Sequence, residues 1–532
     1  MESVDIIISD FLDHDLKTGI GGVLCNVATS FAVDSTSFDG EFNKVYTHKV
    51  NSTDAYSNMG EGKAIIEPTI ANGRMPSQLT VTFGKDPSQD RNFVWFTSQF
   101  APQGNIQYRK QGDTAWTTEL ADSRLMPYAY TMTDFGIFAS SIDKNIMRHN
   151  VRLTKLDAST IYEYRVGDTS RDVWTEIGSF KTAPKVNGAF EVAILSDLQG
   201  MSLEHYEDVN TMLKASSSLY NIAPSFTINL GDIVYSGKNS DEWGYALDIP
   251  AEYWRNTTSL VIAGNRDGKE YTSGKVKERK KAVNVYIEEM TYDPVSFHYD
   301  FGGATLDSKQ YFSLDYSGVH FIMLDTNDLD KAGTKLSGNQ LNWLKNDLKN
   351  TKLAHKVVLM HKGMYSNGIH AGDKDTLGLR KQLAPIFYEN KIDLVLSGHD
   401  NVYSETPRIN AEGKRAEDGV KYVNIAGLIS NKVEMNMESV AMSPEKEEVI
   451  PAMTMGVLSY DGESDKVTYQ GYAMQGEKLV KVEDYNTSAS QPKAPKDNTI
   501  TIIIVCVLVG VAIIGAAVFG IVSKKRSKKN SD

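Results

Sequence analysis

Five apolar stretches of the chain each end in a polar residue of a type that binds metal ions. Taken alone, each of these residues has an ordinary explanation as a turn residue or as a satisfied core histidine. Together, two carboxylates, an amide and two imidazoles form a donor set large enough for two ions, and Tyr235 adds a phenol. Paired ions ~3.5–4 Å apart are the usual device for in-line attack on phosphate esters. In chain order the five residues are Asp197, Asp232, Asn265, His361 and His399.

The elements that must position these residues are strands that alternate with helices, which predicts an α/β domain over residues 186–485. The strands are mostly apolar, as in a sheet that is covered on both faces. Ligands of such sheets bind outside the carboxyl ends of the strands, where all five residues fall. The predicted helices are 337–348, which begins with a serine cap, and 376–390. The predicted strands are 190–195, 226–230, 260–263, 320–324, 357–360 and 394–396.

A different pattern precedes this domain. Over residues 75–184, short stretches alternate apolar and polar residues between turns, which is typical of a half-buried antiparallel sandwich. Its predicted strands are 78–83, 92–97, 105–108, 149–153, 162–166 and 178–182. The sandwich carries no cluster of chemically reactive residues, so we expect a structural or recognition role, with a linker at 183–188. Residues 1–74 show no clear periodic pattern.

Composition limits the possible functions. The chain has 532 residues, a net charge of -12 and a pI of about 5.4, which argues against nucleic acid as a partner. It has two cysteines, and no disulfide framework is expected because Cys506 lies in an apolar segment near the C-terminus. The fold must therefore depend on a large apolar core.

The apolar segment 499–522 is free of charged residues and long enough to cross a bilayer core of roughly 30 Å. A basic tail at 523–532 follows it, which predicts a single-pass protein of the cell surface with a cytoplasmic C-terminus. Residues 486–498 would form a stalk below the extracytoplasmic domains. A buried core helix and a lipid-anchor signal are the alternatives for the apolar segment. Residues 17–33 fit a poor signal peptide and a strand with a loop equally well.

Four short motifs resemble those of the purple acid phosphatases, a family of calcineurin-like metallophosphoesterases. The resemblance covers residues 76–485 and implies a metallophosphoesterase β-sandwich flanked by helices, preceded by a fibronectin-III-like sandwich. It also implies a hydrolase that cleaves phosphate monoesters of small molecules, nucleotides or phosphoproteins by attack of a metal-bound hydroxide. The motifs are Gly231-Asp-Ile-Val-Tyr235, Gly264-Asn-Arg-Asp267, Val358-Leu-Met-His361 and Gly398-His-Asp-Asn401.

The resemblance also implies a role for each site residue. A first ion, ferric in the family, would be held by Asp197, Asp232, Tyr235 and the residue at position 401. A second ion, divalent Fe, Zn or Mn, would be held by Asn265, His361 and His399, with Asp232 as the bridge. The substrate would contact Arg266, Tyr365 and His370, and His370 would donate a proton to the leaving group.

Two positions depart from the family pattern. Asn401 stands where the family usually has histidine, so an amide oxygen replaces an imidazole at the first ion. Arg266 also replaces a usual histidine, and a guanidinium can bind phosphate oxygens but cannot act as a proton donor. These departures leave two alternatives open: a surface recognition protein on a degenerate phosphatase scaffold, and a phosphodiesterase of the same superfamily.

Overall fold

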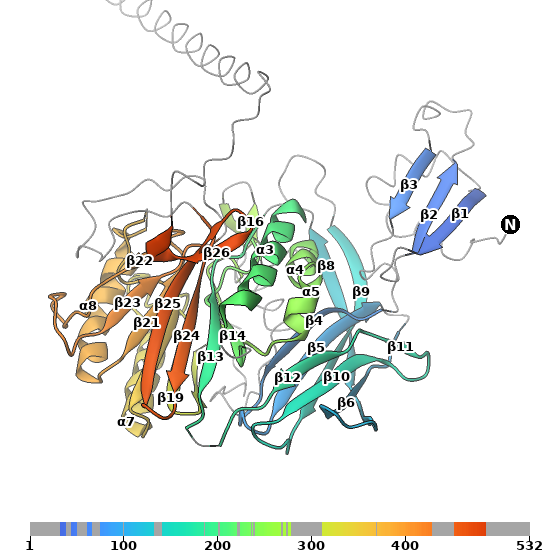
Figure 1. The fold of residues 1–532 in the computed structure, drawn as a ribbon. Helices are drawn as coiled ribbons and strands as arrows, with labels where there is room; N and C mark the ends of the chain where they lie inside the picture. The colour runs from blue at the N-terminus through green and yellow to red at the C-terminus, as the bar shows by residue number, and fades with distance from the viewer. Residues whose placement is uncertain are drawn as a thin grey trace, which may run out of the picture. The chain divides into compact units, whose positions relative to one another are not determined.

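The fold is that of a computed structural model (Figure 1). The structure describes residues 32–38, 44–49, 61–65 and most of 75–485. Within 75–485 the gaps are 99–100, 132–140, 186, 201–202, 221–223, 236, 238–239, 268–269, 273–274, 278–310, 369 and 428–451. The predicted signal peptide, stalk, membrane span and basic tail lie outside the described residues. No helix within the described part is long and apolar enough to span a membrane.

Two sheets pack face to face in the region that carries the predicted metal ligands. One side is the half of a ten-stranded sheet ordered β26-β25-β24-β13-β14-β15, and the other is a six-stranded sheet ordered β18-β19-β20-β21-β23-β22. Their facing side chains, among them Ile228 and Leu359, form a fully buried core between the sheets. The first sheet uses β13 (Phe190–Leu195), β14 (Phe226–Asn229), β15 (Ser259–Val261), β24 (Thr454–Asp461), β25 (Lys466–Gln475) and β26 (Lys478–Lys481). The second uses β18 (Phe312–Tyr316), β19 (Val319–Leu324), β20 (His355–Lys362), β21 (Leu394–Gly398), β22 (Ser404–Glu405) and β23 (Lys421–Asn424).

Helices cover the outer face of each sheet (Figure 1). The helices α3 (Leu203–Ser216), α4 (Ser240–Asp248) and α5 (Ala251–Arg255) pack on the ten-stranded sheet. The helices α7 (Gly338–Asn350) and α8 (Lys374–Glu389) pack on the six-stranded sheet. Ser337 caps α7 by accepting a hydrogen bond from the Gln340 amide, so the predicted serine cap is confirmed. The apolar strands predicted sheets that are covered on both faces, and this prediction is confirmed. Helices α3, α4 and α5 were not predicted.

The region before this domain is all-β, as predicted. Its strands are β4 (Ser77–Phe83), β5 (Arg91–Ser98), β6 (Asn105–Lys110), β7 (Thr117–Leu120), β8 (Asp122–Thr131), β9 (Ser141–Leu153), β10 (Ile161–Asp168), β11 (Val173–Trp174) and β12 (Gly178–Lys181). A second core that includes Phe93, Trp95 and Tyr164 fills the space between its sheets. Three further strands, β1 (Ala32–Phe38), β2 (Lys44–Lys49) and β3 (Glu61–Ile65), form an antiparallel sheet of their own. A short hairpin, β16 (Glu270–Thr272) with β17 (Lys275–Lys277), follows the third motif.

The ten-stranded sheet continues through the predicted boundary between the two regions. Strand β15 pairs in parallel with β4, where Ser259 lies opposite Thr82. Arg91 is fully buried at this junction, and its guanidinium donates to the Thr258 hydroxyl (3.1 Å) and to the Lys181 carbonyl (2.5 Å). The Tyr164 hydroxyl donates to a carbonyl of α5. These contacts join the sandwich and the α/β region through a shared sheet. This connection was not predicted, because a linker at 183–188 implied two separate domains.

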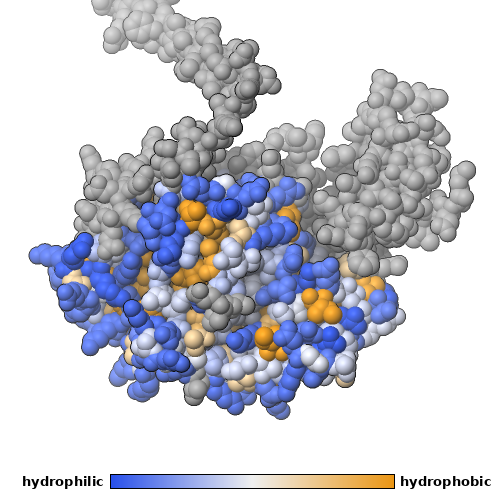
Figure 2. All heavy atoms as spheres, viewed as in Figure 1, coloured by the Kyte–Doolittle hydropathy of each residue, from blue (hydrophilic) through white to orange (hydrophobic). Residues whose placement is uncertain are grey.

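Most of the visible surface is hydrophilic (Figure 2). On the face shown in Figure 2, hydrophilic residues dominate and the apolar ones form a few separate groups. The large apolar side chains that remain exposed include Leu120, Ile177 and Leu377. Isolated exposed apolar residues are normal for a globular surface.

Candidate metal centre

Most of the predicted ligands lie on the turns that follow the carboxyl ends of the strands, whereas His361 is the penultimate residue of strand β20. Four of these residues have backbone φ angles between 51° and 73°, a left-handed conformation that is uncommon for residues other than glycine. Such strained positions cluster at functional sites, because the surrounding structure must enforce them. The four residues are Asp197, Asp232, His399 and Asn401.

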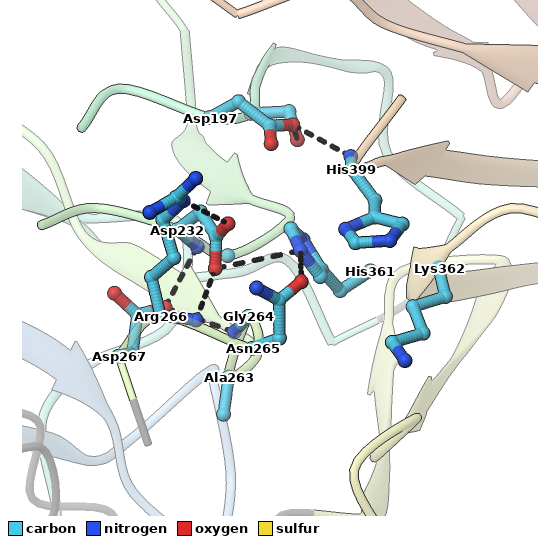
Figure 3. A network of polar contacts seen from close by, with 12 residues as sticks. Asp197, Asp232, Ala263, Gly264, Asn265, Arg266, Asp267, His361, Lys362 and His399 are labelled. Atoms are coloured by element: carbon cyan, nitrogen blue, oxygen red, sulfur yellow. Dashed lines mark hydrogen bonds and ion pairs between the residues drawn. The ribbon is translucent and has the colours of Figure 1, made fainter. Parts of the chain in front are cut away.

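Asp232, His361 and His399 form the centre of the arrangement. Each offers one ligand atom, and these three atoms all lie within 4.8 Å of one another. The His361 and His399 ring centroids are 5.1 Å apart. Figure 3 shows that Asp232, Asn265 and His361 lie together, with His399 and Asp197 next to them. The structure therefore brings together the ligands predicted for the second ion and the predicted bridge.

The orientation of His361 suits a metal ligand. Its Nδ1 lies 2.9 Å from the Leu230 carbonyl oxygen, which can only accept, so Nδ1 carries the hydrogen. In the neutral imidazole the other ring nitrogen, Nε2, then offers a lone pair, and it lies 3.1 Å from Asn265 Oδ1 and 3.4 Å from Asp232 Oδ1. Metal-binding histidines are commonly oriented in this way by a backbone carbonyl.

Two oxygen atoms of the predicted first site are buried and accept no hydrogen bond from the residues that the structure describes. They are Oδ1 of Asp197 and Oδ1 of Asn401. The other oxygen of Asp197, Oδ2, accepts from the Ser196 hydroxyl (2.5 Å) and from the His399 amide (2.8 Å). A buried oxygen without a partner is costly unless an ion or water satisfies it. The donor set of the first site therefore fits a cation that prefers oxygen ligands.

Asp267 was not given a role from the sequence, although it closes the third motif. Its buried carboxylate accepts four backbone N–H groups, from Asp232 (2.7 Å), Ile233 (2.8 Å), Val234 (3.3 Å) and Gly264 (2.9 Å). These bonds fix the turn that carries Asp232 against the turn that carries Asn265. An acidic residue two positions after a predicted ligand was the only sequence signal for this role.

Glycine allows these two turns to approach closely. A Cβ on Gly264 would lie 2.0 Å from Asp232 Oδ1, and a Cβ on Gly231 would lie 2.4 Å from the Gly264 nitrogen. Gly231 also has a φ of 98°. Glycine is therefore required at both positions for the bridge residue to sit beside the third motif.

The electrostatics of the centre favour a bound cation. Burial raises the pKa of the Asp197 and Asp267 carboxyls, and repulsion from Asp232 adds to the rise. Burial also opposes a charge on His361, yet the neighbouring Asp232 raises the pKa of this imidazole. Three buried carboxylates thus compete for positive charge, and a metal ion would relieve their repulsion.

The remaining predicted site residues lie in different surroundings. The His370 ring stacks on the His399 ring at 4.3 Å, and its Nδ1 lies 2.8 Å from Asp373 Oδ2. Asp400 accepts the His370 amide at 2.6 Å and so fixes the loop. Tyr365 is only 6% exposed and packs in the core under α8, which leaves little of its surface for a ligand. The substrate-binding roles of these residues stay predictions.

Arg266 and Tyr235 lie against each other. The guanidinium carbon of Arg266 is 4.2 Å from the centroid of the Tyr235 ring, and Nε is 3.6 Å from Asp232 Oδ2. The Arg266 amide also donates to Asp232 Oδ1 at 2.7 Å. Arg266 therefore contacts Asp232 and Tyr235, which were predicted to bind the first ion together with Asp197.

Two packed sheets with helices outside, and residues of metal-binding types at the strand ends, agree with a calcineurin-like phosphoesterase. The family model described as calcineurin-like phosphoesterase matches residues 190–403. The model described as the purple acid phosphatase N-terminal domain matches residues 76–182. The chain therefore belongs to the purple acid phosphatase family, as the motifs predicted.

Individual relatives agree with this assignment. Purple acid phosphatase 15 of Arabidopsis thaliana is 27% identical over 294 residues, which cover 49% of this chain and 50% of that protein. Purple acid phosphatase 23 of the same plant is 25% identical over 355 residues, which cover 61% and 68%. The chain thus spans about half to two thirds of these relatives. The structure of purple acid phosphatase PPD1 from yellow lupin seeds has a similar fold, with a TM-score of 0.57, 13% identity, and coverage of 86% of this chain and 83% of that one.

Proposed function

We propose that this chain is a dinuclear metallohydrolase that cleaves phosphate esters, with acid phosphatase activity on phosphomonoesters or nucleotide phosphates. The observation that carries the proposal is that ligand atoms of Asp232, His361 and His399 lie within 4.8 Å of one another. Nearby, the buried Asp197 Oδ1 has no hydrogen-bond partner among the residues that the structure describes. A degenerate scaffold that binds no metal is not expected to keep buried carboxylates and imidazoles so close together. Family membership supports the same chemistry.

Asp197, Asp232, Tyr235 and Asn401 would hold the first ion, and Asn265, His361 and His399 would hold the second, with Asp232 between them. When bound, two such ions supply the positive charge that activates a water molecule and binds a phosphate ester. The residues of this chain provide the geometry: the Leu230 carbonyl fixes the His361 tautomer.

His370 would donate a proton to the leaving group. Asp373 accepts the hydrogen on its Nδ1, which directs the other ring nitrogen, Nε2, away from this carboxylate. Stacking on His399 holds the ring next to the proposed second ion. A proton held at Nε2 would then be available to the alcohol oxygen that leaves phosphorus.

The test measures metal content and hydrolysis with the purified full chain. We expect about two metal ions per chain, and turnover of an aryl phosphate that exceeds turnover of the matching diester between about pH 4 and about pH 8. His361→Ala should lower turnover by at least about 100-fold. His355→Ala is the matched control, because His355 begins the same strand that His361 nearly ends. Absence of both metal and turnover would rule out the proposed function, and preference for the diester would favour a phosphodiesterase.

We further propose that a membrane span at 499–522 anchors the enzyme, with its catalytic region outside the cytoplasm. The uncharged apolar composition of this segment and the basic residues after it support this. The full chain should stay with the membrane pellet after an alkaline carbonate wash, and a chain that ends at residue 498 should not. Release of the full chain by the wash would refute the anchor.

A further inference from the structure

The loop between the end of β20 and the start of α8 carries His370 to the ring of a predicted metal ligand. The His370 ring stacks on the His399 ring, with 4.3 Å between the centroids and 24° between the ring planes. The His370 side chain is 34% exposed, so a molecule from solvent can reach it. The position of this imidazole therefore depends on the contacts that hold the loop against His399.

The carboxylate of Asp400 makes these contacts. Asp400 is 4% exposed, and its Oδ1 accepts the backbone amide of His370 at 2.6 Å. The buried Ser366 hydroxyl donates to the same carboxylate, and its oxygen accepts the Gly368 amide at 3.1 Å. A buried carboxylate is costly unless it is hydrogen-bonded, so the fold has a strong reason to keep the loop on Asp400.

Gly368 allows the loop to approach Asp400 closely. A Cβ at this position would lie 2.6 Å from both Cγ and Oδ1 of Asp400, which is too close for any side chain. Asp400 follows His399 directly in the chain, and His399 has a left-handed φ of 73°. The turn that presents the predicted ligand therefore also presents the carboxylate that holds the loop.

We propose that Asp400 is a positioning residue for proton donation, because it holds His370 against His399 and so directs His370 toward the leaving group of the ester. The inference rests on the proposed function, in which His370 gives the proton on Nε2 to the leaving oxygen. As the P–O bond breaks, its electron pair stays on that oxygen, which takes the proton and departs as an alcohol. Asp400 acts on this step only through His370.

The experiment compares two monoesters with the purified full chain. An alkyl phosphate releases a poor leaving group that needs the proton, whereas para-nitrophenyl phosphate releases a good one that needs it little. Asp400→Ala should lower kcat for the alkyl phosphate by about 100-fold, and for para-nitrophenyl phosphate by less than about threefold. Its metal content should equal that of the wild type. Equal losses for the two esters would overturn the inference, because a distorted metal centre would affect both.

A double variant tests whether Asp400 acts through His370. In a His370→Ala background, Asp400→Ala should cause no further loss with the alkyl phosphate, because two residues that serve one step are not additive. Asp400→Asn should lose less than Asp400→Ala, since its amide oxygen can accept the same N–H group. Additive losses in the double variant would overturn the positioning role.

Hydrogen exchange provides a readout that does not depend on turnover. The His370 amide should be protected in the wild type and should exchange at least about tenfold faster in Asp400→Ala and in Gly368→Ala. Gly368→Ala disturbs the contact from the loop side, so it tests the inference even if Asp400→Ala does not fold. Asp248→Ala is a matched control, because the Asp248 carboxylate also accepts a backbone amide at 2.6 Å, that of Gln78. This control should change neither the exchange of the His370 amide nor the ratio of the two turnovers.

The outcomes separate this inference from the proposed function. A wild type that hydrolyses neither ester refutes the proposed function and the inference with it. A wild type that hydrolyses both esters, together with equal losses for both in Asp400→Ala, refutes only the inference. If His370→Ala itself lowers both turnovers equally, His370 is not the proton donor, and the role of Asp400 is refuted while the hydrolase remains.

Discussion

His320 should make the stability of the protein depend on pH. This residue of β19 is 4% exposed, with Nδ1 2.5 Å from Asp315 Oδ1 and Nε2 2.8 Å from Asp347 Oδ2. Burial alone would lower the pKa of His320, but hydrogen bonds to the two carboxylates raise it from 6.5 to about 9. Both ring nitrogens therefore donate, and the imidazolium ties β18 and β19 to α7.

The magnitude follows from the difference between the folded and unfolded pKa values. An ordinary pKa of 6.5 against a folded pKa of about 9 corresponds to roughly 3 kcal/mol of stability. Because the Asp315 side chain is 63% exposed, solvent screening reduces this to roughly 2 kcal/mol. The folded pKa is the higher one, so this stability is fully present below pH 6.5 and is lost as pH rises through about 9.

The assay is denaturant unfolding of the wild type and His320→Gln at about pH 6 and about pH 9.5. The variant should be less stable at the lower pH by roughly 2 kcal/mol more than at the higher pH. Asp347→Asn removes one of the two carboxylates and should reduce this pH dependence. If His320→Gln costs the same free energy at both pH values, the imidazolium is not the source of the stability, and the reasoning is wrong.

Three further substitutions test other parts of the structure. Asp267→Asn should destabilise the protein by roughly 3 kcal/mol and reduce the metal retained after dialysis, because the amide cannot accept all four N–H groups; full metal retention would contradict its positioning role. Ser337→Ala should cost about 1 kcal/mol in the free energy of unfolding, while Ser337→Thr should cost less, and equal losses would argue against the cap. Leu344→Ala should cost about 2–5 kcal/mol through the cavity that it leaves under α7, and Leu344→Met less than about 1.5 kcal/mol; an unchanged unfolding midpoint for alanine would show that the site is not tightly packed.

Short-range patterns in the sequence predicted individual strands and helices. The strands at 190–195 and 357–360 were predicted because apolar runs mark strands buried on both faces. Helix α7 was predicted because a serine cap precedes leucines on one face. The pairing of β4 with β15 was not predicted, because it joins residues that are more than 170 positions apart and no local period encodes it.

The same distinction applies to the site. The strand-end rule was enough to select Asp232, His361 and His399, which the structure brings together. It could not assign a role to Asp267, because four backbone N–H groups converge on it only after two turns have packed together. Nor could it show that the Arg266 side chain lies on Tyr235, since that contact depends on a rotamer and not on spacing.

The pairing of β15 with β4 also affects how the protein behaves when it is shortened or partly unfolded. A sheet that ended at β15 would present unpaired backbone N–H and C=O groups, and such an edge is a template for pairing with other chains. Strand β4 pairs with this edge, and the buried Arg91 binds the Thr258 hydroxyl next to β15. The N-terminal sandwich thus covers a strand edge that would otherwise be open to pairing with other chains. Loss of the sandwich would endanger the solubility of the catalytic region even if every metal ligand stayed in place.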